Sequence, residues 1–207
     1  MSFITSYCQL NNESCLVNGE VLLTHDFEST DSWLKQLYKN QEFVYPKFYK
    51  MDSLSQTGFI LSELIKRAHP KLITSYKDDE IALLFANQYS STDTDIRFKN
   101  SYEQQGAPSP ALFVYTLPNI VLGEIAILNK WYGENMFAVL PKFAPDFFVN
   151  YAGILLATGS EAVLAGWLDI SESQISAIVF LIEKQGVPGT ELTVENLAKI
   201  AGTLEVI

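Results

Sequence analysis

Runs of apolar residues separated by polar turns predict four strands along the chain. The segments 80–87, 162–168 and 176–183 are apolar and of strand length, as expected for strands that are covered on both faces of a sheet. The N-terminal segment 2–9 is rich in β-branched and aromatic residues, which favour extended structure. The segment 88–107 is polar, rich in Ser, Thr, Asp and Gln, and is assigned no element.

Helical spacing of apolar residues predicts five helices between and after these strands. In the segment 51–69, apolar residues such as Leu54, Leu61 and Ile65 recur at helical intervals, and Pro70 follows as a stop. The other predicted helices occupy residues 29–39, 119–130, 145–157 and 194–202. Buried strands that alternate with helices are typical of a three-layer α/β domain with a mixed sheet. The 207 residues suit one such domain, spanning 1–207.

Two longer apolar stretches raise the question of a membrane span. Residues 111–128 and 147–168 approach the ~20 apolar residues that a transmembrane helix needs. Glu124 interrupts the first stretch and Glu161 the second, and an acidic side chain inside a bilayer is costly. We therefore expect buried helices and strands rather than a membrane span.

Composition and charge exclude several classes of function. Fourteen Lys and Arg against 24 Asp and Glu leave a net charge of −10, which argues against nucleic acid as the main partner. Two cysteines and two histidines do not form a zinc motif, and the Asp93-Thr94-Asp95 cluster is typical of a solvated loop. No motif predicts a metal ion or a cofactor. The N-terminus lacks the pattern of a secretory signal, which predicts a cytoplasmic protein.

One part of this acidic chain is locally basic. Residues 35–77 hold eight Lys or Arg against three acids. Such a stretch can dock an acidic partner, although a solvated helix face would have the same composition. The candidate docking residues are Lys35, Lys39, Lys66 and Arg67.

Four segments between residues 50 and 169 resemble, in order and spacing, the N-terminal half of the β-ketoacyl-acyl-carrier-protein synthases. KMDSLSQTGFILSELIKRA resembles the Met-Asp pair and amphipathic helix of that family, and SPALFVYTLPNIVLGEIAI resembles its Ser-Pro-x-x-Phe strand and glycine-containing helix. WYGENMF falls at the position of the Gly-Pro-Asn turn, and LATGSEAVLAGWLD resembles the stretch that ends in Leu-Ala-Gly-Gly. The resemblance implies one thiolase-like half, with a mixed five-stranded sheet, helices on both faces and a strand at 109–116.

The chain departs from that family where the chemistry is performed. The resemblance implies a nucleophilic cysteine at the start of a buried helix, where the helix N-terminus stabilises a thiolate. Counting forward from Gly133 and back from Gly159 leads to Lys142, and no Cys or Ser lies within five residues of it. The histidines of the family belong to a second half that is not in this sequence. The resemblance therefore implies a chain that does not catalyse condensation by itself.

The resulting expectation is a non-catalytic, chain-length-factor-like protein that acts by binding in fatty-acid, polyene or polyketide-type lipid biosynthesis. Its expected partners are a second copy, a full-length ketosynthase and an acyl carrier protein. The resemblance implies that Phe113, Leu117 and Leu122 line an acyl groove or a subunit interface. Two alternatives stay open: an enzyme of different chemistry that uses Lys142 in the former nucleophile pocket, and a purely structural assembly subunit.

Overall fold

A computed structural model describes residues 1–104, 106–171, 174–184 and 188–202. Its centre is a mixed sheet whose strands follow the order β3-β2-β1-β7-β6-β4-β5, with β8 paired to β1. β4 runs parallel to β5 and β6, whereas β7 is antiparallel to both β6 and β1. The strands are β1 (Ser2–Asn11), β2 (Ser14–Val17), β3 (Glu20–Thr24), β4 (Ile81–Asn87), β5 (Asn135–Val139), β6 (Ala162–Ile170), β7 (Ile175–Lys184) and β8 (Thr190–Glu191).

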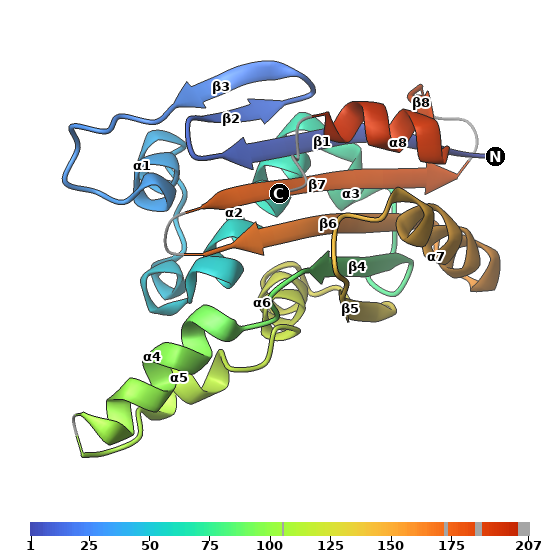
Figure 1. Ribbon diagram of the computed structural model, residues 1–207. Helices are drawn as coiled ribbons and strands as arrows, with labels where there is room; N and C mark the ends of the chain where they lie inside the picture. The colour runs from blue at the N-terminus through green and yellow to red at the C-terminus, as the bar shows by residue number, and fades with distance from the viewer. Residues whose placement is uncertain (105, 172–173, 185–187, 203–207) are drawn as a thin grey trace.

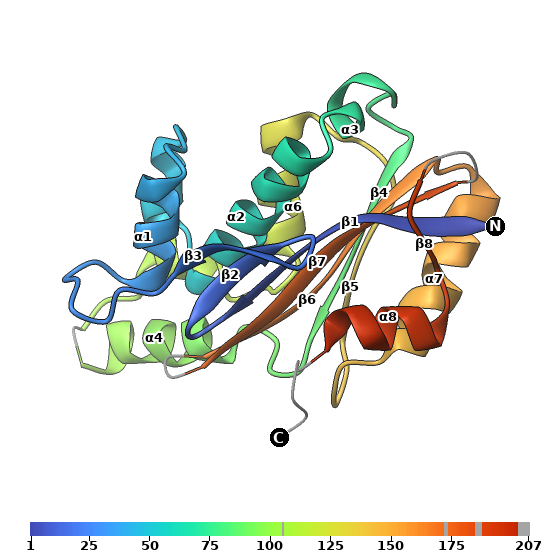
Figure 2. The same ribbon diagram turned by 90° about the horizontal axis from the view of Figure 1, so that it is seen from above.

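Helices cover both faces of this sheet (Figures 1 and 2). One face carries α1 (Trp33–Asn40), α2 (Ser53–Ala68), α3 (Lys71–Thr74) and α6 (Ile120–Asn129), and the other carries α7 (Pro145–Thr158) and α8 (Val194–Ala201). A short 3₁₀ helix, η1 (Pro46–Lys50), precedes α2. The remaining helices, α4 (Thr92–Glu103) and α5 (Pro110–Val114), form an arm that projects from the body of the molecule.

The core divides between the two faces of the sheet. All seven residues of β4 are buried, as are the apolar residues at the centres of β6 and β7. Leu61 and Ile65 of α2 pack on one face, and Phe148 and Ala152 of α7 pack on the other. The predicted α/β class, with a mixed central sheet and helices on both sides, is confirmed. None of the helices in the described ranges is long and apolar enough to cross a bilayer.

Some sequence-based element predictions were wrong or incomplete. The segment 109–116 is not a strand, because Pro110 begins α5 and the Ser109 side chain accepts a hydrogen bond from the Leu112 backbone N–H. Polar residues 92–103 form α4 although they lack an apolar face. The described sheet has eight strands rather than five, because β2, β3 and β8 pair beyond the five that form its centre. β5 also went unpredicted, since its five residues show no clear alternation.

Candidate functional site

The connection between β5 and α7 contains the position of the implied nucleophile. β5 ends at Val139 and α7 begins at Pro145, so Lys142 lies in the connection, three residues before the helix. The Lys142 side chain is exposed to solvent. A lysine that acts as a Schiff base or a general acid needs a desolvated setting. That condition is not met here, so we do not retain the alternative of an enzyme built on Lys142.

The aromatic side chain of Phe143 and the acidic side chain of Asp146 lie at the start of α7. The ring of Phe143 lies 5.6 Å from that of Phe148 and 6.0 Å from that of Trp167, measured between ring centroids. Ala144 is the N-cap residue, and Asp146 lies in the first helical turn. The Asp146 carboxylate interacts favourably with the positive helix end, at the place where the resemblance implies a thiolate. This helix end therefore carries an anionic side chain but no thiol.

The two cysteines of the chain lie elsewhere in the fold. Cys8 is on β1 and Cys15 on β2, and both side chains are fully buried. Burial, reinforced by the neighbouring Cys15, raises the pKa of the Cys8 thiol well above its ordinary value. Burial alone raises the pKa of the Cys15 thiol to about 12. Neither thiol is therefore present as a thiolate near neutral pH.

The structure separates the three residues that were expected to line an acyl groove or interface. Phe113 is 62% exposed and Leu117 is 58% exposed, so both are available to a partner. Leu122, by contrast, is 1% exposed and belongs to the core between α6 and the sheet. The prediction that Leu122 is available at a groove or an interface is therefore wrong, because α6 places this residue in the hydrophobic core.

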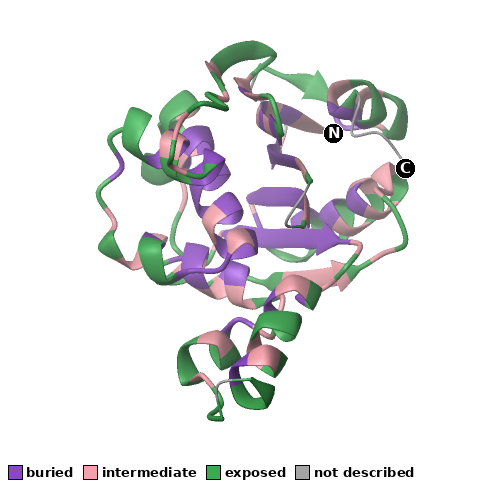
Figure 3. Ribbon diagram, turned by 60° about the vertical axis from the view of Figure 1, so that its left-hand side comes forward, coloured by how far each residue is buried: buried purple, intermediate pink, exposed green. Residues whose placement is uncertain are grey.

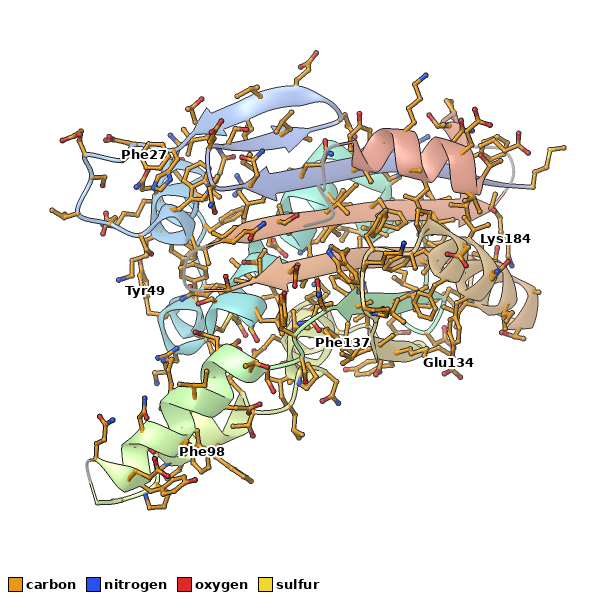
Figure 4. The ribbon with its side chains drawn as sticks, viewed as in Figure 1. Phe27, Tyr49, Phe98, Glu134, Phe137 and Lys184 are labelled. Carbon is orange, nitrogen blue, oxygen red and sulfur yellow. The ribbon has the colours of Figure 1, made fainter. Side chains whose placement is uncertain are left out.

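Most apolar residues of the arm formed by α4 and α5 (Figure 1) are exposed, and Figure 3 colours much of this arm as exposed or intermediate. Phe98 lies on α4 within the arm (Figure 4), and its ring centroid lies 5.5 Å from that of Phe113 on α5, a contact that joins the two helices. The Ser101 hydroxyl accepts a hydrogen bond from the Ser109 backbone N–H at 3.0 Å. The exposed apolar residues of the arm and of the turn that follows it are Ile96, Tyr102, Phe113, Val114 and Leu117.

β5 forms one edge of the sheet. It pairs with β4 on one side, and within the described residues its outer edge has no partner strand. The strand sequence NMFAV contains no Lys or Pro, the residues that commonly protect such an edge. Val139, Ile127 and Tyr132 are 54%, 67% and 71% exposed and lie in or near it. We call β5 and the exposed apolar residues of the arm the β5–arm surface.

The four candidate docking cations lie on α1 and on the last turn of α2. Lys39 pairs with Asp31 at 2.5 Å, and Lys66 pairs with Glu63 at 2.6 Å. Arg67 donates a hydrogen bond to the Gln41 carbonyl oxygen at 2.7 Å and lies over the ring of Phe43. Lys35 is exposed, and no acidic partner is within ion-pair distance of it in the described part of the chain.

The sequence analysis did not identify the partners of two buried carboxylates, Glu124 and Glu183. Glu183, which is 1% exposed, ends the apolar run of β7, accepts a hydrogen bond from the Tyr76 hydroxyl and lies 3.2 Å from His69 Nε2. Glu124, which is 4% exposed, accepts a hydrogen bond from the Tyr115 hydroxyl at 3.1 Å. An acidic residue within or at the end of a strongly apolar segment is the signal that could have identified both.

Several solved structures have the same arrangement of strands and helices. The ishigamide ketosynthase/chain length factor matches with a TM-score of 0.67 at 14% identity, over 89% of this chain and 62% of that chain. A type II polyketide synthase acyl-carrier protein in complex with its ketosynthase bound to the hexaketide matches with a TM-score of 0.62 at 10% identity, over 89% and 62%. This chain has the thiolase-like fold of the β-ketoacyl synthases. The resemblance seen in the sequence is thus confirmed as a likeness of fold.

A third match comes from a ketosynthase in complex with its chain length factor from Xenorhabdus doucetiae. It has a TM-score of 0.59 at 14% identity and covers 98% of this chain and 91% of the matched chain. The chain therefore spans about three fifths of the first two matched chains but almost the whole of this one. No protein-family model and no curated protein matches the sequence. At these identities the likeness shows the fold and not the activity.

Proposed function

We propose that the protein is a non-catalytic ketosynthase-like subunit that acts by binding a full-length ketosynthase, in the manner of a chain length factor, in fatty-acid, polyene or polyketide-type lipid biosynthesis. The proposal is supported by a ketosynthase-like fold together with the sequence, in which no Cys or Ser lies within five residues of the exposed Lys142, the position where the resemblance implies the nucleophile. The match in fold to a chain of the ketosynthase and chain length factor complex from Xenorhabdus doucetiae supports the proposal.

The β5–arm surface is the proposed contact with the ketosynthase. An unprotected edge strand can accept another strand, which extends the sheet through backbone hydrogen bonds. A partner of the same fold would present a like edge, and a two-fold or pseudo-two-fold axis between the two edges makes the paired strands antiparallel. The exposed side chains of Phe113 and Leu117 would then be removed from water. Burying a large apolar side chain contributes roughly 1.5–3 kcal/mol, enough for each to affect affinity strongly.

Co-expression with a full-length ketosynthase from the same organism tests this proposal. The two proteins are expected to co-purify as a stable complex in size-exclusion chromatography with light scattering. Phe113→Glu and Leu117→Glu should each weaken the complex by at least about tenfold, because a charge would be buried in the contact. Val21→Glu, at a 62% exposed position on the opposite edge strand β3, is the matched control and should leave the affinity unchanged.

One result would overturn the proposed role, and a second would overturn the proposed contact. One is condensation or decarboxylation of malonyl thioesters by the purified protein without a partner. The other is a ketosynthase complex that all three variants form equally well. In the second case the β5–arm surface is not the contact.

A homodimer is the second candidate, because a two-fold contact between identical β5 edges is self-complementary. This arrangement corresponds to the structural assembly subunit and uses the same surface. Analytical ultracentrifugation of the protein alone would show a dimer at micromolar concentration, and Leu117→Glu would dissociate it. A monomer at that concentration excludes this candidate but leaves the ketosynthase complex to be tested.

A further inference from the structure

A pocket of about 370 Å³ lies at the α1 end of the molecule. Its walls come from the segment after β3, the first turns of α1 and α2, and the adjoining ends of β6 and β7. Phe27 lines this pocket and lies well away from Phe137 of β5 (Figure 4). The volume is within the roughly 300–1,000 Å³ that is usual for small-molecule sites. The pocket is therefore large enough for a ligand and separate from the β5–arm surface.

Three aromatic rings in contact form one wall of the pocket, of which His25 and Trp33 are stacked and Phe27 is tilted against His25. The His25 ring lies 4.1 Å from that of Phe27 and 4.9 Å from that of Trp33, between centroids, and is nearly parallel to the latter. His25 Nδ1 is 2.8 Å from the Asn12 carbonyl oxygen, and Trp33 Nε1 donates to the Asn11 carbonyl oxygen at 2.8 Å. Phe27 remains 69% exposed. The two inner rings are thus held in place, and the outer ring offers an open stacking surface.

Uncharged polar groups complete the lining. Ser32 is the N-cap residue of α1, yet its hydroxyl accepts no hydrogen bond from the first turn of that helix. The N–H groups of that turn therefore lack their usual cap. Ser53 and Gln56 line the pocket from α2, and the Gln56 side-chain N–H donates to the Phe48 carbonyl oxygen, which leaves its amide oxygen free to accept. Among the lining residues that the structure describes, none is Asp, Glu, Lys or Arg.

We propose that this pocket binds an uncharged, planar ring that carries a hydrogen-bond acceptor. The exposed aromatic wall favours a flat ring, because aromatic groups stack face to face with an offset. The hydroxyl of Ser32 and the uncapped first turn of α1 provide donors for a carbonyl or similar oxygen. A charged ligand would lose hydration here without gaining an opposite charge from any lining residue that the structure describes. This proposal does not depend on the proposed ketosynthase partnership.

Titration of the full-length, ¹⁵N-labelled protein with three small probes tests the proposal by NMR. Benzamide is flat and neutral, benzoate is flat and charged, and cyclohexanecarboxamide is neutral and not flat. Benzamide should shift the Trp33 indole N–H and the backbone N–H groups of Phe27 and Ser53 saturably. It should bind at least about fivefold more tightly than either of the other probes, the difference that about 1 kcal/mol of stacking or desolvation gives.

Phe27→Ala should weaken benzamide binding by a similar, roughly fivefold factor, since it removes the exposed stacking surface. Tyr132→Ala is the matched control, because Tyr132 is equally exposed but lies near β5. The Phe27 side chain is mostly in solvent, so the fold should survive its removal, which the amide spectrum checks directly. The proposal would be overturned if all three probes bound with equal affinity or if the largest chemical-shift changes lay outside the pocket. It would also be overturned if Phe27→Ala and Tyr132→Ala lowered the affinity for benzamide equally.

Discussion

Lys47 Nζ lies 2.7 Å from Glu124 Oε2, although the Lys47 side chain is 41% exposed and that of Glu124 is 4% exposed. The other carboxylate oxygen of Glu124 accepts the hydrogen bond from Tyr115, the residue that follows α5. Burial and the neighbouring Glu124 charge raise the pKa of the Tyr115 hydroxyl, so it stays protonated as a donor. One buried carboxylate thus joins η1, α6 and the base of the arm, and it holds part of the proposed contact surface in position.

Lys47→Met should destabilise the protein more than Glu124→Gln does. The first change leaves a buried carboxylate without its cation, at a cost of about 2–4 kcal/mol. Glutamine at position 124 can still accept the Tyr115 hydrogen bond, and Lys47 can extend into water, so we expect a loss of about 1 kcal/mol. Urea unfolding measures both values, with Lys50→Met as an exposed control. The reverse order would show that the pair does not hold the arm.

Two glycine-to-alanine changes should alter stability in opposite directions. A Cβ at Gly58 of α2 would lie 2.3 Å from Val121 Cγ2 of α6, so the two helices would have to move apart. We expect Gly58→Ala to cost about 1–3 kcal/mol. Gly123 of α6 has open space around the same position, and alanine there should stabilise the helix by about 0.5–1 kcal/mol. Thermal unfolding of both variants compares them, and a shift of the same sign in both would contradict the packing described.

The two thiols should be unreactive in the folded protein. Burial raises the pKa of Cys8 and Cys15, so almost none of either thiol is ionised at pH 8, and both are shielded from reagents. A chromogenic disulfide reagent should label no cysteine under native conditions and both in denaturant. Labelling of a native thiol within minutes would mean that one of them is accessible and would reopen the question of a thiol nucleophile.

Binding of an acyl carrier protein, if it occurs on α1 and the end of α2, should weaken with salt. The sequence predicts docking of an acidic partner on Lys35, Lys39, Lys66 and Arg67, of which Lys35 has no ion-pair partner in the described chain. Raising ionic strength from about 0.1 M to 1 M shortens the Debye length from about 10 Å to 3 Å, so an electrostatic contact loses affinity. Lys35→Glu should lower the affinity at low salt, and Lys199→Glu on α8 should not. Calorimetry that shows equal affinity at both salt concentrations would rule out this docking surface.

The sequence pattern of a segment predicted its secondary structure correctly where that pattern agreed with the burial of the segment in the fold. β4, β6 and β7 are apolar along most of their length and lie at the centre of the sheet, so their pattern and their burial agree. The signals conflicted at 109–116, where Phe113, Val114 and Tyr115 favour a strand but Pro110 and the Ser109 cap start a helix. The segment forms helix α5 because the arm extends away from the sheet (Figure 1), where no strand is available to pair with it.

The candidate site was only partly predictable for a related reason. The absence of Cys and Ser within five residues of Lys142 can be read directly from the sequence, because it concerns residue types alone. Which apolar residues remain exposed cannot be read in that way: Leu117 and Leu122 are chemically identical, yet one is 58% exposed and the other 1%. The sequence likewise does not show that β5 is an edge strand, because that depends on which strands pair across long sequence separations.

The amino-acid sequence by itself therefore determined the buried strands, the main helices and the absence of a thiol or hydroxyl nucleophile beside Lys142. Only the tertiary structure decided which surfaces stay uncovered, namely the β5–arm surface and the aromatic pocket at His25. The physical reason is that the hydrophobic effect has no direction, so it requires that apolar side chains be buried somewhere but does not select which of them. That selection follows from how distant segments pack against one another.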